Sequence, residues 1–344
     1  MAPTHPTDTA HQTALVLVLS FASLAAFLSS SSHLEHVAAA ARRTGTLTVL
    51  VRTPANSPSP WSASLNDASG SSSSSSTSSA PPPLSPSPVQ LWLPLERAIA
   101  RVYSAASKVF LADGRVLAAV DVVLEQMRVL PFCIPNGTDV VRWDVEEDTE
   151  DSVESTWEQG EWRDAYEVVA LGGTFDHLHA GHKILLSMAC AITTRKLVVG
   201  VSDDVLLKNK KHAQYLESLA QRTLAVERFI ELLRPTVQHD VVPLQDVYGP
   251  TAYDPEIGAL VVSDETRAGG DTINRLRAAE KGLSKLDVHV INLVADDAES
   301  ASSDSPAPAV KVEAAAKMGS TGIREWMAKQ EARSADGTST ARKA

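Results

Sequence analysis

The hydrophobic positions in the second half of the chain follow two alternating periods. Short, almost continuously apolar runs of strand length recur after Tyr166, and stretches with apolar residues at helical spacing separate them. The expected strands are Val168–Leu171, Leu197–Ser202, Val237–Leu244, Ala259–Ser263 and Val288–Val294. The expected helices are Gly181–Thr193, Ser218–Leu233, Asp271–Gly282 and Ile323–Glu331. Apolar strands alternating with helices predict an α/β fold with a parallel sheet covered on both faces.

The first 143 residues carry a smaller set of the same signals, so we expect a smaller α/β N-terminal region of unknown role. The predicted elements are strands at Ala14–Leu19, Leu47–Val51 and Val116–Leu124, a helix ending near Arg42–Arg43 and a helix over Leu91–Ala106. The apolar run Ala14–Leu28 also raises a membrane anchor or signal peptide. It is short for a span, is interrupted by serines and has no basic start. A strand followed by a helix explains the run, and we expect no membrane span.

Polar segments divide the chain. Residues 53–88 hold a polyserine tract and three consecutive prolines, and they have too few apolar residues to offset the entropy of ordering. Residues 144–164 form a predicted acidic linker, residues 296–316 a second disordered insertion and residues 333–344 a disordered tail. The predicted division is therefore an N-terminal region of residues 1–143 and a second domain of residues 165–332.

Composition narrows the class of protein. The net charge of −11 argues against a general nucleic-acid-binding protein. The two cysteines, Cys133 and Cys190, cannot form a disulfide scaffold and fit a reducing compartment, so we expect a cytoplasmic protein.

The strand Val168–Leu171 runs into paired glycines and then a threonine. Gly172 and Gly173 permit a close approach of backbone to ligand, and Thr174 adds a hydroxyl. The positive end of the following helix favours a negatively charged group. In parallel sheets, ligands bind beyond the carboxyl ends of the strands, where the winding reverses.

Two histidines open that helix. His179 and His182 are three residues apart, so both can face the same side, and Gly181 between them leaves room for a base or a ribose. The joint pattern predicts a nucleoside triphosphate site rather than a glycine turn with surface histidines. A zinc site on His177, His179 and His182 is a weaker alternative, because no cysteine or carboxylate completes a ligand set nearby, and we expect no metal site.

Three further elements have ordinary explanations when each is taken alone. Lys208 and Lys210 follow the second strand and could reach a phosphate, but a solvated basic loop explains them better. Ser320 and Thr321 could be helix caps or could bind β- and γ-phosphates, with Arg324 one turn further on. Arg277 alone indicates only a surface helix arginine.

Together these motifs resemble the phosphopantetheine adenylyltransferase family, in its eukaryotic and archaeal branch. The matching segments are Gly172-Gly-Thr-Phe-Asp-His-Leu-His-Ala-Gly-His-Lys183, Val199-Gly-Val-Ser-Asp203, Leu207-Lys-Asn-Lys210, Asp246-Val-Tyr-Gly-Pro250, Val261-Val-Ser-Asp-Glu-Thr266 and Ile273-Asn-Arg-Leu-Arg277. The resemblance implies a Rossmann-like nucleotidyltransferase domain. It also implies adenylyl transfer from ATP to 4′-phosphopantetheine, which gives dephospho-coenzyme A and pyrophosphate in coenzyme A biosynthesis.

The resemblance also implies roles for single residues. His182, Lys208 and Lys210 would be catalytic, with Thr174 and the lysines holding the acceptor phosphate and the α-phosphate. The residues implied to bind substrate or ATP are Gly172, Gly173, Thr174, Phe175, His179, Gly181, Arg277, Ser320, Thr321 and Arg324. Mg²⁺ is expected to arrive with ATP, since no carboxylate cluster marks a cage for it. One departure is Gly319, which stands where the family usually has a serine.

The N-terminal region is faintly similar to the leading region of animal bifunctional coenzyme A synthase. No P-loop motif occurs in the chain, so we expect a monofunctional enzyme of the fungal type, working beside a separate dephospho-coenzyme A kinase. One alternative is a related nucleotidyltransferase that uses another phosphorylated acceptor. Another is a scaffold of a complex that synthesises coenzyme A.

Overall fold

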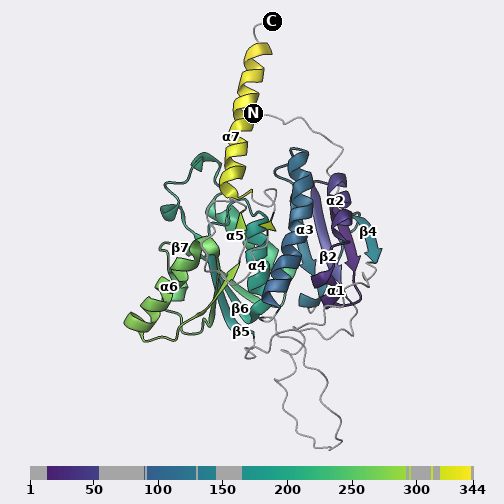
Figure 1. Ribbon diagram of the computed structural model, residues 1–344. Coiled ribbons are helices and arrows are strands. Elements are labelled where there is room, and N and C mark those ends of the chain that lie inside the picture. The colour runs from purple at the N-terminus through teal and green to yellow at the C-terminus, as the bar shows by residue number, and fades with distance from the viewer. Residues whose placement is uncertain are drawn as a thin grey trace, which may run out of the picture.

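The computed structural model describes residues 14–53, 89, 91–128, 131–144, 165–291, 294–295, 311–312 and 318–341. Two parallel sheets lie side by side, and the last helix projects away from both of them (Figure 1). The segments predicted as the 53–88 insertion, the 144–164 linker and the 296–316 insertion lie almost wholly outside the described residues. Within the last of them, β11 (Lys311–Val312) pairs with β10 (Val294–Ala295).

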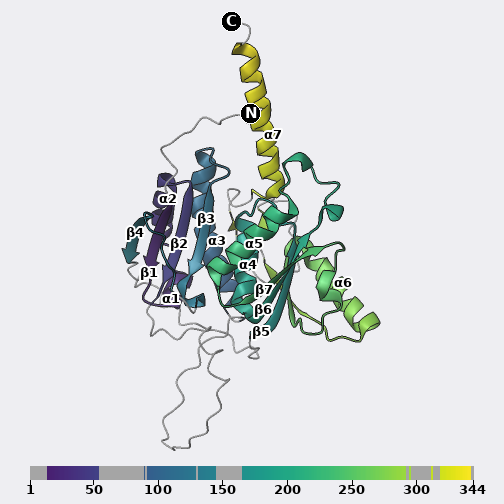
Figure 2. The ribbon, with the colours of Figure 1, turned by 180° about the vertical axis from the view of Figure 1, so that it is seen from behind.

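The N-terminal sheet has the parallel strand order β3-β2-β1-β4. Its strands are β1 (Leu15–Ser20), β2 (Thr46–Arg52), β3 (Ala119–Leu124) and β4 (Asp139–Asp144). The helices α1 (Leu24–Ser29), α2 (Leu34–Arg43) and α3 (Trp92–Ala112) cover one face, and Figure 2 shows the other face toward the viewer. The predicted strand Ala14–Leu19 is β1. The single predicted helix ending near Arg42–Arg43 is instead two helices, α1 and α2, and the second ends at Arg43. No helix in the described part of the chain is long and apolar enough to cross a membrane.

The second sheet has the parallel order β7-β6-β5-β8-β9 and confirms the predicted α/β fold. Its strands are β5 (Tyr166–Gly173), β6 (Thr193–Ser202), β7 (Gln238–Leu244), β8 (Ala259–Ser263) and β9 (Asp287–Ile291). Its helices are α4 (Ala180–Ile192), α5 (Leu219–Leu233) and α6 (Arg267–Leu276), with a π turn at Arg277–Lys281. Short 3₁₀ turns lie at Glu125–Met127, Asp204–Leu206, Ala213–Tyr215, Gly249–Ala252 and Asp264–Thr266. Because the winding reverses between β5 and β8, the end of β5 is the point at which such sheets bind ligands.

The final helix α7 (Ser320–Ala341) is longer than predicted. It passes the expected end at residue 331 and continues through most of the segment predicted to be a disordered tail. No proline interrupts this stretch, and its alanines favour helix, so nothing local ends the helix at residue 333.

The two sheets share one hydrophobic core. Helix α3 of the N-terminal sheet packs against α4 of the second sheet, and a single cluster of buried side chains includes Leu95 and Ile99 of α3 with Ile184 of α4. The indole Nε1 of Trp92 donates to the Val290 carbonyl at 3.2 Å. The N-terminal sheet therefore buttresses the helix that follows β5.

Candidate active site

The turn after β5 is shaped by one buried aromatic ring. Phe175 is fully buried and has a left-handed backbone, with φ of 51°. A β-carbon added to Gly173 would approach the Phe175 ring to 3.2 Å, so any larger residue there would require the ring to shift. The turn thus holds Gly173 and Thr174 at the switch point of the sheet.

His179 and His182 stack on each other at the start of α4, with ring centroids 3.9 Å apart. Burial lowers the pKa of His179 to about 4, although the Asp176 carboxylate acts in the opposite direction. Burial and the neighbouring His179 hold the pKa of His182 well below its usual range. Among the described residues, His182 Nδ1 is buried with no hydrogen-bond partner. Both imidazoles are therefore neutral near pH 7 and can donate hydrogen bonds without carrying charge.

The start of α7 docks onto the same turn. Ser320 Oγ donates to the Asp176 carbonyl at 2.8 Å, and the Arg324 guanidinium pairs with the buried Asp176 carboxylate. Arg324 also donates to the Lys211 carbonyl and to Thr321 Oγ1, at 3.0 and 3.2 Å. The structure therefore brings the predicted Ser320, Thr321 and Arg324 to the predicted histidines.

The predicted lysines lie on a loop beyond the end of β6. Leu207 is buried and anchors this loop, whereas Lys208 and Lys210 are exposed. Since β5 and β6 are parallel neighbours, the loop and the Gly172–Gly173 end of β5 share one edge of the sheet.

Comparison with known proteins agrees with this geometry. The cytidylyltransferase-like family model matches residues 170–308. The phosphopantetheine adenylyltransferase of Saccharomyces cerevisiae is 37% identical over 225 residues, which are 58% of this chain and 71% of the yeast protein. This chain belongs to the phosphopantetheine adenylyltransferase family. It is a nucleotidyltransferase, as the motifs predicted.

Two further relatives extend the comparison. The phosphopantetheine adenylyltransferase of Methanopyrus kandleri is 40% identical over 128 residues, covering 37% of this chain and 80% of the archaeal protein. An uncharacterized protein of Schizosaccharomyces pombe is 37% identical over 162 residues, covering 47% of this chain and 48% of that protein.

Among the family motifs, the prediction for Arg277 needs correction. It is 1% exposed, not a surface arginine, and its donors are directed at backbone. The carbonyls that accept from it are those of Thr251, Asp254, Ile257 and Ser284. Because the guanidinium is enclosed by these carbonyls, Arg277 clamps the loop before β8 and is not available to a phosphate in this structure.

A second buried arginine was missed by sequence reasoning. Arg222 of α5 is fully buried and donates to the carbonyls of Thr174, Ser202 and Glu217 at 2.9, 2.7 and 3.0 Å. It therefore fixes the turn after β5 relative to the end of β6. The one signal in the sequence was an arginine within the apolar pattern of the predicted helix Ser218–Leu233.

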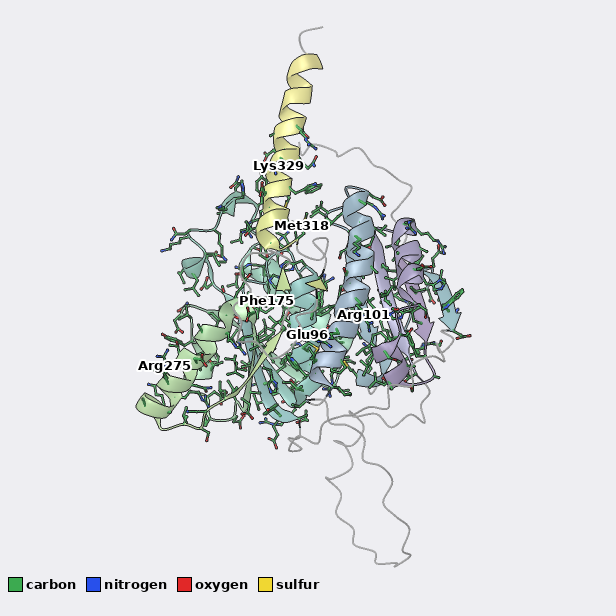
Figure 3. All side chains as sticks on the ribbon, in the orientation of Figure 1. Glu96, Arg101, Phe175, Arg275, Met318 and Lys329 are labelled. Atoms are coloured by element: carbon green, nitrogen blue, oxygen red, sulfur yellow. The ribbon has the colours of Figure 1, made fainter. Side chains whose placement is uncertain are left out.

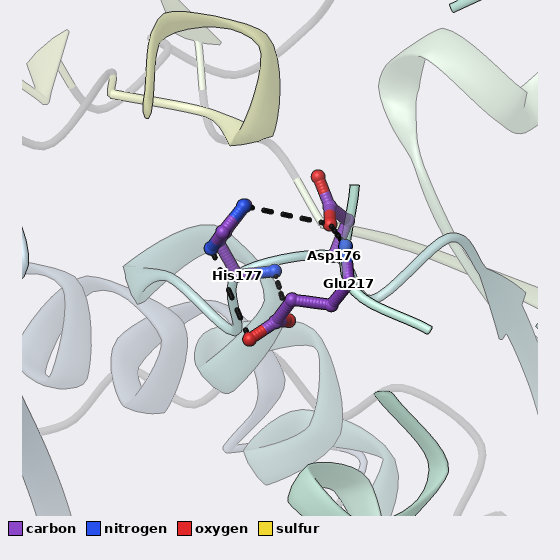
Figure 4. A group of neighbouring side chains, drawn as sticks. All are labelled: Asp176, His177 and Glu217. Carbon is purple, nitrogen blue, oxygen red and sulfur yellow. Dashed lines mark hydrogen bonds and ion pairs between the residues drawn. The ribbon is translucent and has the colours of Figure 1, made fainter. Parts of the chain in front are cut away.

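The expectation that no carboxylate completes a ligand set near the histidines needs correction at His177, because Asp176 and Glu217 flank it (Figure 4). The His177 backbone N–H donates to Glu217 Oε2 at 2.7 Å, and His177 Nε2 donates to the Tyr215 carbonyl at 2.8 Å. Asp176 accepts from the Glu217 backbone N–H at 2.9 Å and pairs with Arg324. These bonds fasten the loop before α5 to the turn.

A cavity of about 370 Å³ lies where the two sheets meet. The N-terminal wall is mostly apolar and includes Phe110 and Leu117. The opposite wall includes His179, Lys183 and Met318, which stands at the foot of α7 (Figure 3). The N-terminal sheet therefore forms part of the immediate surroundings of the histidine motif.

Proposed function

We propose that this chain transfers the adenylyl group of ATP to 4′-phosphopantetheine, giving dephospho-coenzyme A and pyrophosphate. The observation that carries the proposal is the stacked, neutral pair His179–His182 at the switch point, with the start of α7 docked on the same turn. The relatives named phosphopantetheine adenylyltransferase support this choice of acceptor.

The chemistry needs positioning more than proton transfer. A phosphate oxygen of the acceptor attacks the α-phosphorus, and the bond from that phosphorus to the β-phosphate bridging oxygen breaks in line. The acceptor phosphate is already ionised near neutral pH, since its second pKa is about 6, so no general base is required. The remaining task is to stabilise charge on the transferring group by fixed donors.

We assign His182 as the donor to the α-phosphate, because its buried and neutral ring supplies an N–H inside the site. Thr174, Lys208 and Lys210 would hold the acceptor phosphate and the α-phosphate. The backbone of Gly172 and Gly173 would approach the nucleotide, and Phe175 would support it from below.

The start of α7 and His179 would bind the part of ATP that leaves as pyrophosphate. His179, Ser320 and Thr321 would donate to the β- and γ-phosphates, with Gly181 leaving space for the nucleotide. Arg324 is committed to Asp176, so we assign it to hold this helix start in place.

Mg²⁺ is part of this proposal, bound to the triphosphate and to water. The cluster of Asp176, His177 and Glu217 does not fit a cage for it. Mg²⁺ prefers an octahedral set of oxygens, whereas this cluster contains an imidazole and already pairs its buried carboxylate with Arg324. We also propose a cytoplasmic location and a separate dephospho-coenzyme A kinase that consumes the product.

The test is incubation of the purified chain with ATP, Mg²⁺ and 4′-phosphopantetheine, with chromatography of dephospho-coenzyme A and pyrophosphate. His182→Ala should lower kcat about 10²-fold or more, the usual scale for a lost transition-state donor. His36→Ala, which alters a histidine of α2, is the control and should retain turnover.

Product formed equally well by His182→Ala would remove the role of His182 as donor to the α-phosphate. Pyrophosphate released only with a different phosphorylated acceptor would move the assignment to another nucleotidyltransferase reaction. No turnover with any acceptor would favour the scaffold alternative.

A further inference from the structure

We propose that Asp121 of the N-terminal sheet is a positioning residue for adenylyl transfer, acting through Lys183 on the helix that carries His182. The inference rests on the proposed function. It makes the N-terminal sheet a working part of the active site.

The contact joins one residue of β3 to the histidine motif. Lys183 follows His182 directly, and its side chain is only 10% exposed. Its Nζ donates to Asp121 Oδ1 at 2.6 Å and to the Val120 carbonyl at 2.8 Å. Two of the three ammonium donors are thus directed at β3, more than sixty residues earlier in the chain.

An ammonium so deeply buried has to be paired, because an unpaired charge in the interior is strongly unfavourable. The geometry of Asp121 therefore constrains where the first turn of α4 can lie. The Phe229 ring, 5.6 Å from Nζ, lies on the α5 side of the ammonium and offers no charge of its own.

His182 depends on this placement more than a hydrogen-bonded histidine would. Its Nδ1 has no partner among the described residues, and its ring is held by packing against Phe175 and His179 at 5.2 and 3.9 Å. No bond from Nδ1 corrects the ring if α4 shifts. A shift of about 1 Å in a catalytic group can cost about 10²-fold in rate.

A double-mutant cycle in the full chain tests the coupling. Asp121→Asn, Lys183→Met and the double variant are compared for kcat, for KM of both substrates and for thermal stability. We expect each single variant to lower kcat about 10-fold or more with little change in KM, and the double variant to be no worse than the poorer single variant.

Glu125→Gln is the matched control. It breaks the ion pair with Arg52 at 2.7 Å, which joins the turn after β3 to β2 within the N-terminal sheet region. It should lower stability and leave kcat within about 2-fold.

A measurement without turnover separates this inference from the proposed function. The ring resonances of His182, assigned by their loss in His182→Ala, should move in Asp121→Asn and stay in place in Glu125→Gln. Unmoved resonances would overturn the positioning role. So would a loss of kcat in the double variant equal to the product of the two single fold-losses. Moved resonances in a chain that makes no dephospho-coenzyme A would keep the placement of His182 by Asp121 and reject the reaction.

Discussion

Arg324 and Asp176 form an ion pair that is almost entirely closed to solvent, with side chains 1% and 0% exposed. The pair joins the last helix to the turn after β5, although 148 positions separate the two residues. Asp176 also accepts a hydrogen bond from the Glu217 backbone. One carboxylate therefore fixes the relative positions of three segments around the histidines.

Removing the arginine should destabilise the protein strongly. Arg324→Gln leaves the Asp176 carboxylate buried without its cation, and such losses cost about 3–5 kcal/mol. Urea unfolding measures the change. The control is Lys329→Gln in the same helix, which removes a 2.7 Å pair with Glu325 whose side chains are 65% and 50% exposed. That change should cost less than about 0.5 kcal/mol. Equal effects of the two variants would show that the Arg324 pair contributes little.

The exposed lysines should affect substrate binding without affecting stability. Lys208→Ala and Lys210→Ala remove mobile positive charges that we assign to phosphates, so kcat/KM should fall and depend less on salt. Lys211→Ala is the control, because its backbone carbonyl binds Arg324 and its exposed side chain has no assigned phosphate. Steady-state kinetics at two ionic strengths would also rank the two lysines. A loss in Lys211→Ala as large as in the other two would indicate only a general basic loop.

Gly319 can be converted to the serine that the family usually carries. Among the described residues, the nearest atom to a β-carbon there is His179 Nε2 at 4.0 Å, so the added carbon fits without strain. We expect Gly319→Ser to keep the melting temperature and lower KM for ATP a few-fold by adding a hydroxyl near the triphosphate. The matched Gly319→Ala variant adds the carbon alone and should leave KM unchanged. If both variants behave alike, a backbone amide already supplies this contact.

The strands that position the site were predictable because the apolar pattern that defines each one lies within a single short segment. β5, β6 and β8 are apolar on both faces and stand out as continuous runs. β4 was not predicted, because this edge strand is mostly exposed and reads as a polar segment. The spacing of His179 and His182 likewise sufficed to place both rings on one side of α4.

The buried contacts of Arg222, Arg277 and Lys183 were not predictable, because their partners lie in distant segments of the chain. A buried guanidinium is made acceptable by carbonyls that come together only in the folded chain, and Arg222 and Arg277 find theirs on distant loops. The bond between Lys183 and Asp121 depends on how one sheet packs against the other. No periodicity within either segment contains that information.

Acid should destabilise the protein partly through His33. The ring is fully buried between Phe21 and Phe27, and neither nitrogen has a partner among the described residues. Burial, followed by the nearby positive Arg101 and by His36, lowers the pKa of His33 to about 4.

Because this folded pKa lies below the unfolded value of about 6.5, the unfolded state binds the proton more tightly. Stability is therefore present above pH 6.5 and is lost as pH falls from about 6.5 toward 4. The loss from this group between pH 7 and pH 5 is on the order of 2 kcal/mol. His33→Phe should reduce the difference between urea unfolding at pH 7 and pH 5. His179 retains part of the dependence, since its pKa is also about 4. An unchanged difference in the variant would exclude His33 as a source.

The neutrality of the stacked histidines has a consequence for what this site can accept. The three arginines in or near the site, Arg222, Arg277 and Arg324, donate their hydrogen bonds to groups inside the protein. Both imidazoles are uncharged. Lys208 and Lys210 are left to face a polyanion. The site therefore offers hydrogen-bond donors but little positive charge to balance a triphosphate. We expect it to select the nucleotide with a bound cation over the nucleotide without one.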